Sequence, residues 1–287
     1  MMPKRIKKIL KIIGIFLLVF FIGLVIAAHI FLSPTSDKKA LTELSINGLY
    51  PKIIHKTYNG FEYRVAEMQQ KIDTSLLTLV FVHGSPGDFL DYKRYLTDST
   101  LNVRANLLSY DRVGYGMEHT GNVQGSIAFE LGLLDAVTNG IPAEKIVLIG
   151  YSYGGPIVLA SPKNYKYKVS LASAVNADLE PMFWGLKIYD WKLTRWILPK
   201  KVQAAAKEKY SHLSDLPKYA ELWNKSPSPI VNIQGDADWI VPYKNSIFLQ
   251  QKIDADKFKM ITLKGVGHEL VWSNFDVIKS EILKTLK

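Results

Sequence analysis

The first apolar pattern along the chain is one long run near the N-terminus. Residues 12–36 contain no charged side chain when His29 is neutral, and the run from Ile12 to Leu32 is apolar almost throughout. A helix rises about 1.5 Å per residue, so this run spans about 30 Å, the thickness of a bilayer's hydrocarbon core. Five basic residues precede it, which favours a cytoplasmic N-terminus. We therefore expect residues 1–36 to be a membrane anchor, with the globular part on the extracytoplasmic side.

A cleaved signal peptide is the alternative for this segment. Its apolar region is usually shorter, roughly 7–15 residues, and ends at a small-x-small site. Ala27 and Ala28 offer only a poor site of this kind, and further apolar residues follow them. Cleavage would release the globular part as a secreted or periplasmic protein.

After a short connector at residues 37–50, the apolar pattern changes to short runs separated by polar residues. Residues 52–58 and 61–68 flank Asn59-Gly60, which indicates a β-hairpin. Further short runs predict buried strands at 76–82, 105–109, 145–150, 168–174, 229–234 and 258–263. Helices are predicted at 88–96, 127–137 and 274–286. Strands alternating with helices predict one α/β domain over residues 51–287, with a mainly parallel twisted sheet, helices on both faces and antiparallel N-terminal strands.

One segment interrupts this alternation. Residues 178–226 are too long for a single crossover helix, and they hold four of the six tryptophans of the chain. An aromatic insertion that leaves the carboxyl end of a strand is typical of a lid over a pocket. The alternative is a set of helices that pack their aromatic side chains into a common core with the sheet.

Composition and charge exclude several function classes. The net charge is +10, but residues 1–40 hold seven basic residues and one acid, which leaves +4 for the rest of the chain. No basic run marks a nucleic-acid surface. The chain has no cysteine, so disulfides, thiolate metal sites and a cysteine nucleophile are excluded. No metal, phosphate-loop or dinucleotide motif is present, and we expect neither a metal nor a cofactor.

The strongest chemical signal is the pentapeptide Gly150-Tyr151-Ser152-Tyr153-Gly154. It begins where the strand at 145–150 ends, and an apolar run at 157–160 follows it. In a G-x-S-x-G turn between strand and helix, the glycines let neighbouring backbone approach closely and the serine hydroxyl is exposed at the turn. Because a serine hydroxyl is a weak nucleophile, it needs a base to remove its proton. Ser152 is the candidate nucleophile.

Four further motifs accompany this pentapeptide, each at the end of a predicted strand. They are H-G-S-P-G at 83–87, D-R-V-G-Y-G at 111–116, G-D-A-D-W-I-V-P at 235–242 and G-V-G-H at 265–268. With these motifs in this order, residues 50–287 resemble the α/β-hydrolase family. The resemblance is to its lidded branch of esterases, C–C bond hydrolases and proline-iminopeptidase-like enzymes.

The resemblance implies a role for each motif. The N–H groups of Ser85 and Tyr153 would form the oxyanion hole, while Asp238 would orient the catalytic base His268. Asp236 is the alternative acid. In this family the turn at 111–116 is mainly structural, so Asp111 and Arg112 receive no catalytic role.

The expected function is hydrolysis of a small-molecule carboxylic ester or acyl substrate with an apolar portion, through an acyl-serine intermediate. One alternative is an aminopeptidase of the proline-iminopeptidase type. It would need an acid in the insertion to bind the substrate's amine, and the candidates are Glu180, Asp190, Glu208, Asp215 and Glu221. The other alternative is a non-catalytic binding protein with the same fold. The substrate and the oligomeric state are not predicted.

Overall fold

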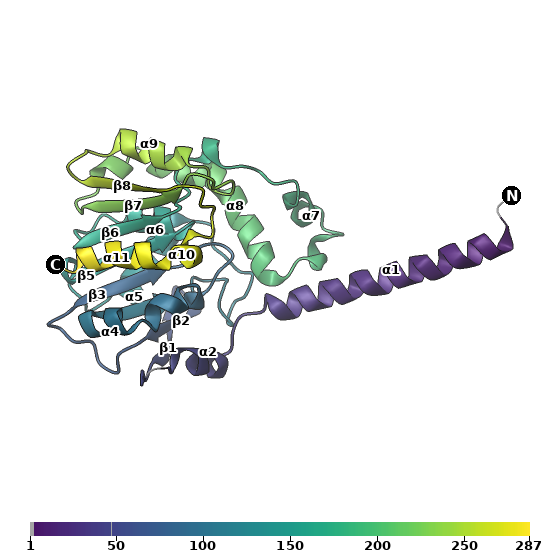
Figure 1. Ribbon diagram of the computed structural model, residues 1–287, viewed down its shortest axis with the longest axis horizontal. Coiled ribbons are helices and arrows are strands. Elements are labelled where there is room, and N and C mark those ends of the chain that lie inside the picture. The colour runs from purple at the N-terminus through teal and green to yellow at the C-terminus, as the bar shows by residue number, and fades with distance from the viewer. Residues whose placement is uncertain (1–2, 47) are drawn as a thin grey trace.

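The computed structural model describes residues 3–46 and 48–287, in which eight strands form one sheet of order β1-β2-β4-β3-β5-β6-β7-β8 (Figure 1). β1 and β2 are antiparallel to their neighbours, and the remaining strands are parallel. The strands are β1 Lys52–Tyr58, β2 Phe61–Glu67, β3 Leu77–Val82, β4 Ala105–Tyr110, β5 Ile146–Tyr151, β6 Tyr167–Leu171, β7 Ile230–Gly235 and β8 Phe258–Leu263. The predicted α/β-hydrolase fold is confirmed.

The strand patterns explain their places in the sheet. The hairpin between β1 and β2 turns at Asn59 and Gly60, both with positive φ, as a two-residue hairpin turn requires. β4, β5 and β7 are buried along their whole length, in agreement with their continuous apolar runs. β1 lies at the edge of the sheet and is only partly buried.

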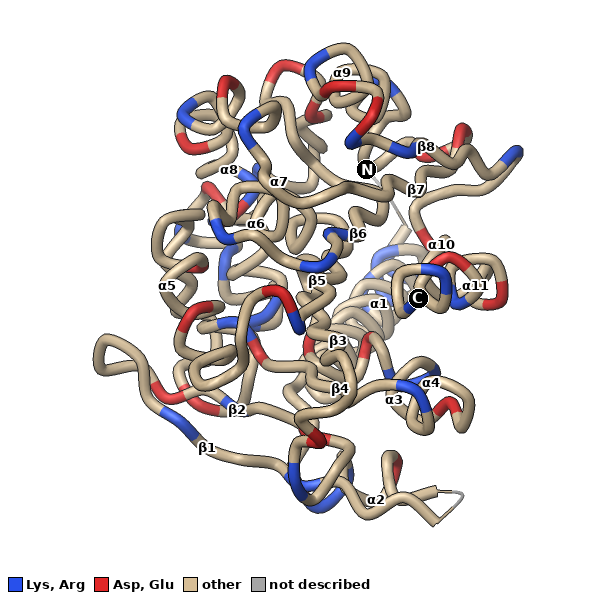
Figure 2. Tube along the Cα trace, turned by 90° about the vertical axis from the view of Figure 1, so that its left-hand side faces the viewer, with Lys and Arg blue, Asp and Glu red and all other residues tan. Residues whose placement is uncertain are grey.

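Helices cover both faces of the sheet. On β3, Leu79 and Phe81 face one apolar core while Val80 and Val82 face the other. The first core receives side chains of α2 Asp37–Leu44, α3 Lys93–Leu96, α4 Ser99–Arg104, α10 Leu270–Ser273 and α11 Phe275–Thr285. The second face is covered by α5 Ile127–Val137, α6 Gly154–Ala160 and α9 Lys244–Lys252. Basic and acidic residues are interspersed over the domain (Figure 2).

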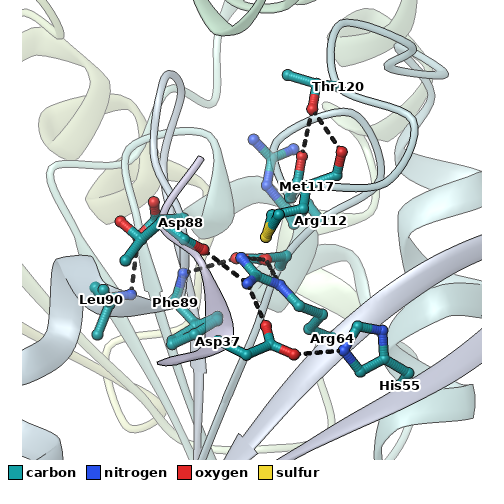
Figure 3. A network of polar contacts seen from close by, with 12 residues as sticks. Asp37, His55, Arg64, Asp88, Phe89, Leu90, Arg112, Met117 and Thr120 are labelled. Atoms are coloured by element: carbon teal, nitrogen blue, oxygen red, sulfur yellow. Dashed lines mark hydrogen bonds and ion pairs between the residues drawn. The ribbon is translucent and has the colours of Figure 1, made fainter. Parts of the chain in front are cut away.

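The segment expected as a connector contains the helix α2. Ala40 and Leu44 of this helix are fully buried in the first core. Asp37, at its first turn, accepts one hydrogen bond from Arg64 at 2.7 Å and contacts His55 at 2.7 Å (Figure 3). Arg64 is buried and also donates to Asp111. Packing and charge thus attach the chain to the domain from residue 37 onward.

The N-terminal helix α1 Lys4–Phe31 projects away from the sheet (Figure 1). Its most apolar 18-residue window has a mean hydropathy of 3.0, and none of that window is buried. The helix is long and apolar enough to cross a membrane, as an anchor or a signal sequence is. Within α1, Val25, Ala28 and His29 are half-buried and lie along one helix face, and the other residues are exposed.

The insertion at residues 178–226 folds into α7 Leu186–Asp190, α8 Lys200–Tyr219 and short 3-10 turns. Its tryptophans separate into two groups. Trp223 is fully buried in a core with residues of α6 and α9. Trp184, Trp191 and Trp196 are exposed. The common-core alternative therefore describes only the C-terminal end of the insertion.

Candidate active site

Ser152 lies in a sharp turn between β5 and α6. Its φ is +54°, a left-handed backbone conformation that residues other than glycine rarely adopt. The close approach of neighbouring backbone explains the adjacent glycines. A Cβ on Gly154 would lie 2.1 Å from the carbonyl oxygen of Val82, and one on Gly150 would lie 2.3 Å from that of Gly154. The local sequence therefore permits a turn that a bulkier sequence would not.

Three side chains from distant parts of the chain meet at this turn. The Nε2 atom of His268 lies 3.0 Å from the Oγ of Ser152. The Nδ1 atom of the same ring lies 2.8 Å from the Oδ2 of Asp238. The residues come from the loops that follow β5, β7 and β8, which meet because parallel strands present their carboxyl ends at one sheet edge. The predicted base is within hydrogen-bonding reach of the predicted nucleophile.

The carboxylate of Asp238 is buried and held from several sides. Its Oδ1 accepts hydrogen bonds from the backbone N–H groups of Ile240 and Val241, each at 2.9 Å. Its Oδ2 accepts one from the amide of Gln234 at 2.9 Å, in addition to the contact with His268. The alternative acid, Asp236, is exposed, and it accepts a hydrogen bond from the N–H of Gly265.

Ser85 and Tyr153 line the cavity described below, together with Ser152 and His268. Neither the N–H group of Ser85 nor that of Tyr153 donates a hydrogen bond to another residue within 3–46 and 48–287. The loop passes very close to the nucleophile, since a Cβ on Gly84 would lie 2.9 Å from the Cβ of Ser152. The arrangement leaves two N–H groups free to bind a substrate oxygen.

His83 and Arg112 form hydrogen bonds with the backbone of the loop that contains Gly84 and Ser85. His83 accepts a hydrogen bond from the N–H of Arg112 at 3.0 Å, so the proton of the neutral ring is on Nδ1, which contacts the carbonyl of Gly84 at 2.7 Å. Burial, with Arg112 nearby, lowers the pKa of His83 well below its ordinary value. The guanidinium of Arg112 donates to the carbonyls of His83 and Gly84. These hydrogen bonds hold the backbone of residues 83–84 in place.

A buried ion pair joins the same arginine to the insertion. Arg112 donates to both oxygens of Glu208 on α8, at 2.8 and 2.9 Å, and also contacts Glu130. Burial acts to raise the pKa of Glu208, but the charge and hydrogen bonds of Arg112 outweigh it and lower that pKa. Tyr115 donates to Glu208 and is hydrogen-bonded to the Ser85 hydroxyl, so that hydroxyl is occupied. This network fixes α8 above the loop that ends at Ser85.

A cavity of about 640 Å³ lies between the insertion and the sheet edge. Ser152 and His268 open onto it, together with apolar side chains from both sides. The apolar lining includes Phe183, Leu186, Ile188, Leu198, Val202, Ile240 and Val241. This volume is in the range of small-molecule sites.

One corner of the cavity is polar. Lys209 forms an ion pair with Glu180, and the Nδ1 of His212 lies 3.5 Å from the same carboxylate. Glu180 is one of the acids that the sequence offers for binding an amine, whereas no sequence motif includes Lys209 or His212. Lys209 and His212 lie on one face of α8 together with Val202 and Ala205, which also line the cavity. This helical spacing is the sequence pattern from which they could have been identified.

Metal binding has no visible basis in this site. Within residues 3–46 and 48–287, no cluster of three or more His, Asp or Glu side chains is placed to hold a metal ion.

Solved structures share this fold across most of the chain. A carboxylesterase structure from the thaumarchaeon Nitrososphaera gargenis superimposes with a TM-score of 0.63 at 14% identity, covering 82% of this chain and 98% of that chain. A membrane phospholipase A described as a bacterial virulence factor superimposes with a TM-score of 0.62 at 15% identity, covering 98% of each chain. At these identities the likeness shows the fold alone.

Sequence comparison adds a relative and a family. A stretch of 99 residues is 32% identical to the proline iminopeptidase of Saccharolobus solfataricus, covering 33% of this chain and 32% of that protein. The match therefore spans about a third of the relative's length. Residues 136–284, more than half of the chain, match the model of the prolyl oligopeptidase family. The chain belongs to the prolyl oligopeptidase family and is a serine hydrolase of the α/β-hydrolase fold.

Proposed function

We propose that this protein hydrolyses carboxylic esters with an apolar portion, using Ser152, His268 and Asp238 as its catalytic triad. The single observation that carries the proposal is the continuous contact from the Ser152 hydroxyl through His268 to Asp238. A buried carboxylate hydrogen-bonded to one ring nitrogen orients the imidazole and stabilises its protonated form. The free N–H groups of Ser85 and Tyr153 form the proposed oxyanion hole.

The reaction proceeds in two halves. The Nε2 of His268 takes the proton of Ser152 as its Oγ attacks the ester carbonyl, and the N–H groups of Ser85 and Tyr153 bind the resulting oxyanion. Collapse of this intermediate breaks the ester C–O bond, and His268 gives its proton to the departing alcohol. Water then attacks the acyl-serine with His268 again as base, which releases the acid and restores the Ser152 hydroxyl.

The lining of the cavity supports an apolar acyl or alcohol portion. We propose that residues 178–226 act as a lid, because the aromatic and aliphatic side chains of the insertion form one wall above Ser152. Burying an apolar group against such a wall is favourable by about 25 cal/mol per Å². The polar corner at Glu180, Lys209 and His212 leaves room for one polar group of the substrate.

An aminopeptidase is less well supported, although a proline iminopeptidase is among the relatives. It needs an acid with an unneutralised charge to bind the substrate's amine. Among the candidate acids only Glu180 lines the cavity, and Lys209 already neutralises it. The other candidate acids are bonded elsewhere: Asp190 to Tyr210, Glu208 to Arg112, Asp215 to Ile127 and Lys218, and Glu221 to Lys252.

We further propose that α1 anchors the enzyme, with the N-terminus cytoplasmic and the catalytic domain extracytoplasmic. The length and hydropathy of α1 support this, as do the basic residues Lys4, Arg5, Lys7, Lys8 and Lys11 that precede its apolar part. An anchored chain stays in the membrane pellet after alkaline carbonate washing. Release of an N-terminally shortened protein into the soluble fraction would instead support signal cleavage.

The catalytic proposal is tested with the Ser152→Ala variant and p-nitrophenyl acyl esters. We expect a loss of at least about 10⁴-fold in kcat, because removing a triad nucleophile leaves only binding and oxyanion stabilisation. Ser214→Ala, an exposed serine on α8, is the matched control and should keep the parental rate. Parental turnover in Ser152→Ala would contradict the assignment.

A second measurement separates the two rival functions. A fluorophosphonate probe should label the parent chain and not Ser152→Ala, and absence of labelling in the parent would favour a binding protein. Comparing acyl esters with amino-acyl amides then separates an esterase from an aminopeptidase. Faster turnover of the amides would overturn the ester proposal and retain the triad.

A further inference from the structure

The insertion exposes large apolar side chains to the surroundings. Trp184 is 80% exposed, Leu193 is 70% exposed, and Trp191 and Trp196 are each 61% exposed. With Met182 they form a group that we call the insertion face. Isolated exposed apolar residues are ordinary, but three tryptophans within thirteen residues are a concentrated apolar surface.

The insertion face lies on the side of the domain from which α1 leaves. Figure 1 shows the α7 end of the insertion extending away from the sheet on the same side as that to which α1 projects. Only residues 32–36 separate α1 from α2, and α2 is packed into the domain core. Five residues reach at most about 18 Å, so a bilayer that holds α1 lies next to this side of the domain.

The charges around the insertion face suit a lipid headgroup layer. Lys187, Lys192 and Lys200 are exposed on the same segment, with Arg195 beside them. Asp190 is the one acid between residues 181 and 200, and it accepts a hydrogen bond from Tyr210. Tryptophans together with lysine and arginine are the composition of membrane-interface segments, and the basic groups favour anionic lipids.

The same segment also forms a wall of the cavity. Trp184 points outward, while its neighbours Phe183 and Gly185 line the cavity, as do Leu186 and Ile188 on α7. The wall between the insertion face and the cavity above Ser152 is therefore a single layer of chain. An acyl chain that leaves a bilayer at the insertion face has a short apolar path to the nucleophile.

We propose that the insertion face rests in the headgroup layer of the bilayer that α1 crosses, and that the enzyme takes acyl-ester lipids directly from this layer. The proposal rests on the function proposed above, because it needs α1 in the membrane and Ser152 as nucleophile. It commits to the bilayer as the occupant of the insertion face, rather than to a second copy of the chain.

Tryptophan fluorescence tests the contact, because α1 contains no tryptophan. The full chain is reconstituted into phosphatidylcholine vesicles with a minor share of phosphatidylglycerol, with or without brominated acyl chains. In the Trp239→Phe/Trp272→Phe variant, three of the four remaining tryptophans lie in the insertion face. Brominated lipid should remove the larger part of this emission.

Three outcomes would contradict contact between the insertion face and the bilayer. Emission unaffected by brominated lipid, from a chain that sediments with the vesicles, would exclude the bilayer as occupant. Cross-linked dimers through the insertion face in the same sample would assign it to a second copy. A chain that does not sediment with the vesicles would contradict the anchor and with it this inference.

Activity tests the consequence for the substrate. In Trp184→Ser/Trp191→Ser/Trp196→Ser, hydrolysis of a short soluble p-nitrophenyl ester should stay at the parental rate, because none of these side chains lines the cavity. Hydrolysis of a vesicle-embedded acyl ester should fall at least about tenfold, although α1 still holds the variant at the membrane. Val103→Ser, equally exposed on α4 at the other end of the domain, is the matched control.

These arms distinguish the inference from the proposal on which it rests. Parental hydrolysis of the vesicle ester by the triple variant would overturn the inference while the triad stands. If the parent chain hydrolysed neither substrate, the catalytic proposal would be contradicted. Quenching by brominated lipid would in that case still support contact between the insertion face and the bilayer.

Discussion

The imidazole of His212 lies flat on the phenol ring of Tyr153, with ring centroids 4.7 Å apart and ring planes 8° apart. This stack places α8 of the insertion directly above the residue that follows the nucleophile. His212 is buried, and neither of its ring nitrogens makes a hydrogen bond within the described residues. Its Nδ1 faces the carboxylate of Glu180 at 3.5 Å, and both residues line the cavity. From this position we infer that His212 contributes to the polar corner of the cavity and favours a substrate that carries a polar group there.

His212→Phe tests this inference, because phenylalanine keeps the stacked ring and removes both nitrogens. We expect the ratio of kcat/KM for a hydroxylated acyl ester to that for the plain acyl ester to fall about tenfold, as for one lost hydrogen bond of 1–3 kcal/mol. The measurement compares matched p-nitrophenyl esters with and without the hydroxyl. An unchanged ratio would mean that His212 only packs.

Asp238→Asn tests whether the carboxylate of Asp238 fixes the orientation and tautomer of the His268 ring. The amide keeps the size of the side chain and its bonds to the loop backbone, but it donates where the carboxylate accepts. The favoured ring then carries its proton on Nε2 and cannot take the proton of Ser152. We expect kcat to fall about 10⁴-fold with a small change in KM. Asp236→Asn, on the same loop but exposed, is the control and should lose little.

The sequence could place the candidate residues together because each motif follows a strand of the predicted sheet. Once β5, β7 and β8 are assigned as parallel strands of one sheet, Ser152, Asp238 and His268 must lie at the same edge of that sheet. Choosing Asp238 over Asp236 needed the family resemblance, since two carboxylates two residues apart are equivalent by spacing. In the structure Asp238 is buried and contacts the Nδ1 of His268, whereas Asp236 is exposed.

The insertion was much less predictable. Its length and aromatic content indicated a lid. No sequence feature, however, shows that Glu208 is a buried partner of Arg112 while Glu180 lines the cavity. That difference depends on the rotation of α8 over the sheet, which tertiary contacts decide. The segment at 37–50 was likewise expected as a connector, because an eight-residue helix with two apolar side chains facing the core gives a weak pattern.

Arg112→Met should destabilise the fold. It leaves Glu208 and Glu130 buried without their cation, and uncompensated buried charges cost about 3–5 kcal/mol. We expect a lower urea midpoint of unfolding in detergent solution. Arg104→Met, an exposed arginine on α4, is the control and should stay within about 0.5 kcal/mol of the parent chain. Equal midpoints for the two variants would show that the buried network contributes nothing to stability.

The buried side chain of Lys168 should make the free energy of unfolding depend on pH. It is fully buried on β6, where its ammonium donates to the carbonyls of Leu159 and Ser161 and has no carboxylate partner within the described residues. Burial lowers its pKa from 10.5 to about 7. Between those values the unfolded chain binds a proton that the folded chain does not, so the free energy of unfolding rises with pH across this window.

Replacing this lysine removes that dependence. Between pH 7 and pH 9 we expect the parent chain to gain about 2 kcal/mol of stability relative to Lys168→Met, from the linkage of a single shifted group. Urea unfolding of both chains at the two pH values gives the difference directly. Lys166→Met, an exposed lysine two residues earlier, should follow the parent chain at both values. A difference between the parent and Lys168→Met that stays constant from pH 7 to pH 9 would show that the buried ammonium keeps its charge throughout, held by the two carbonyls alone.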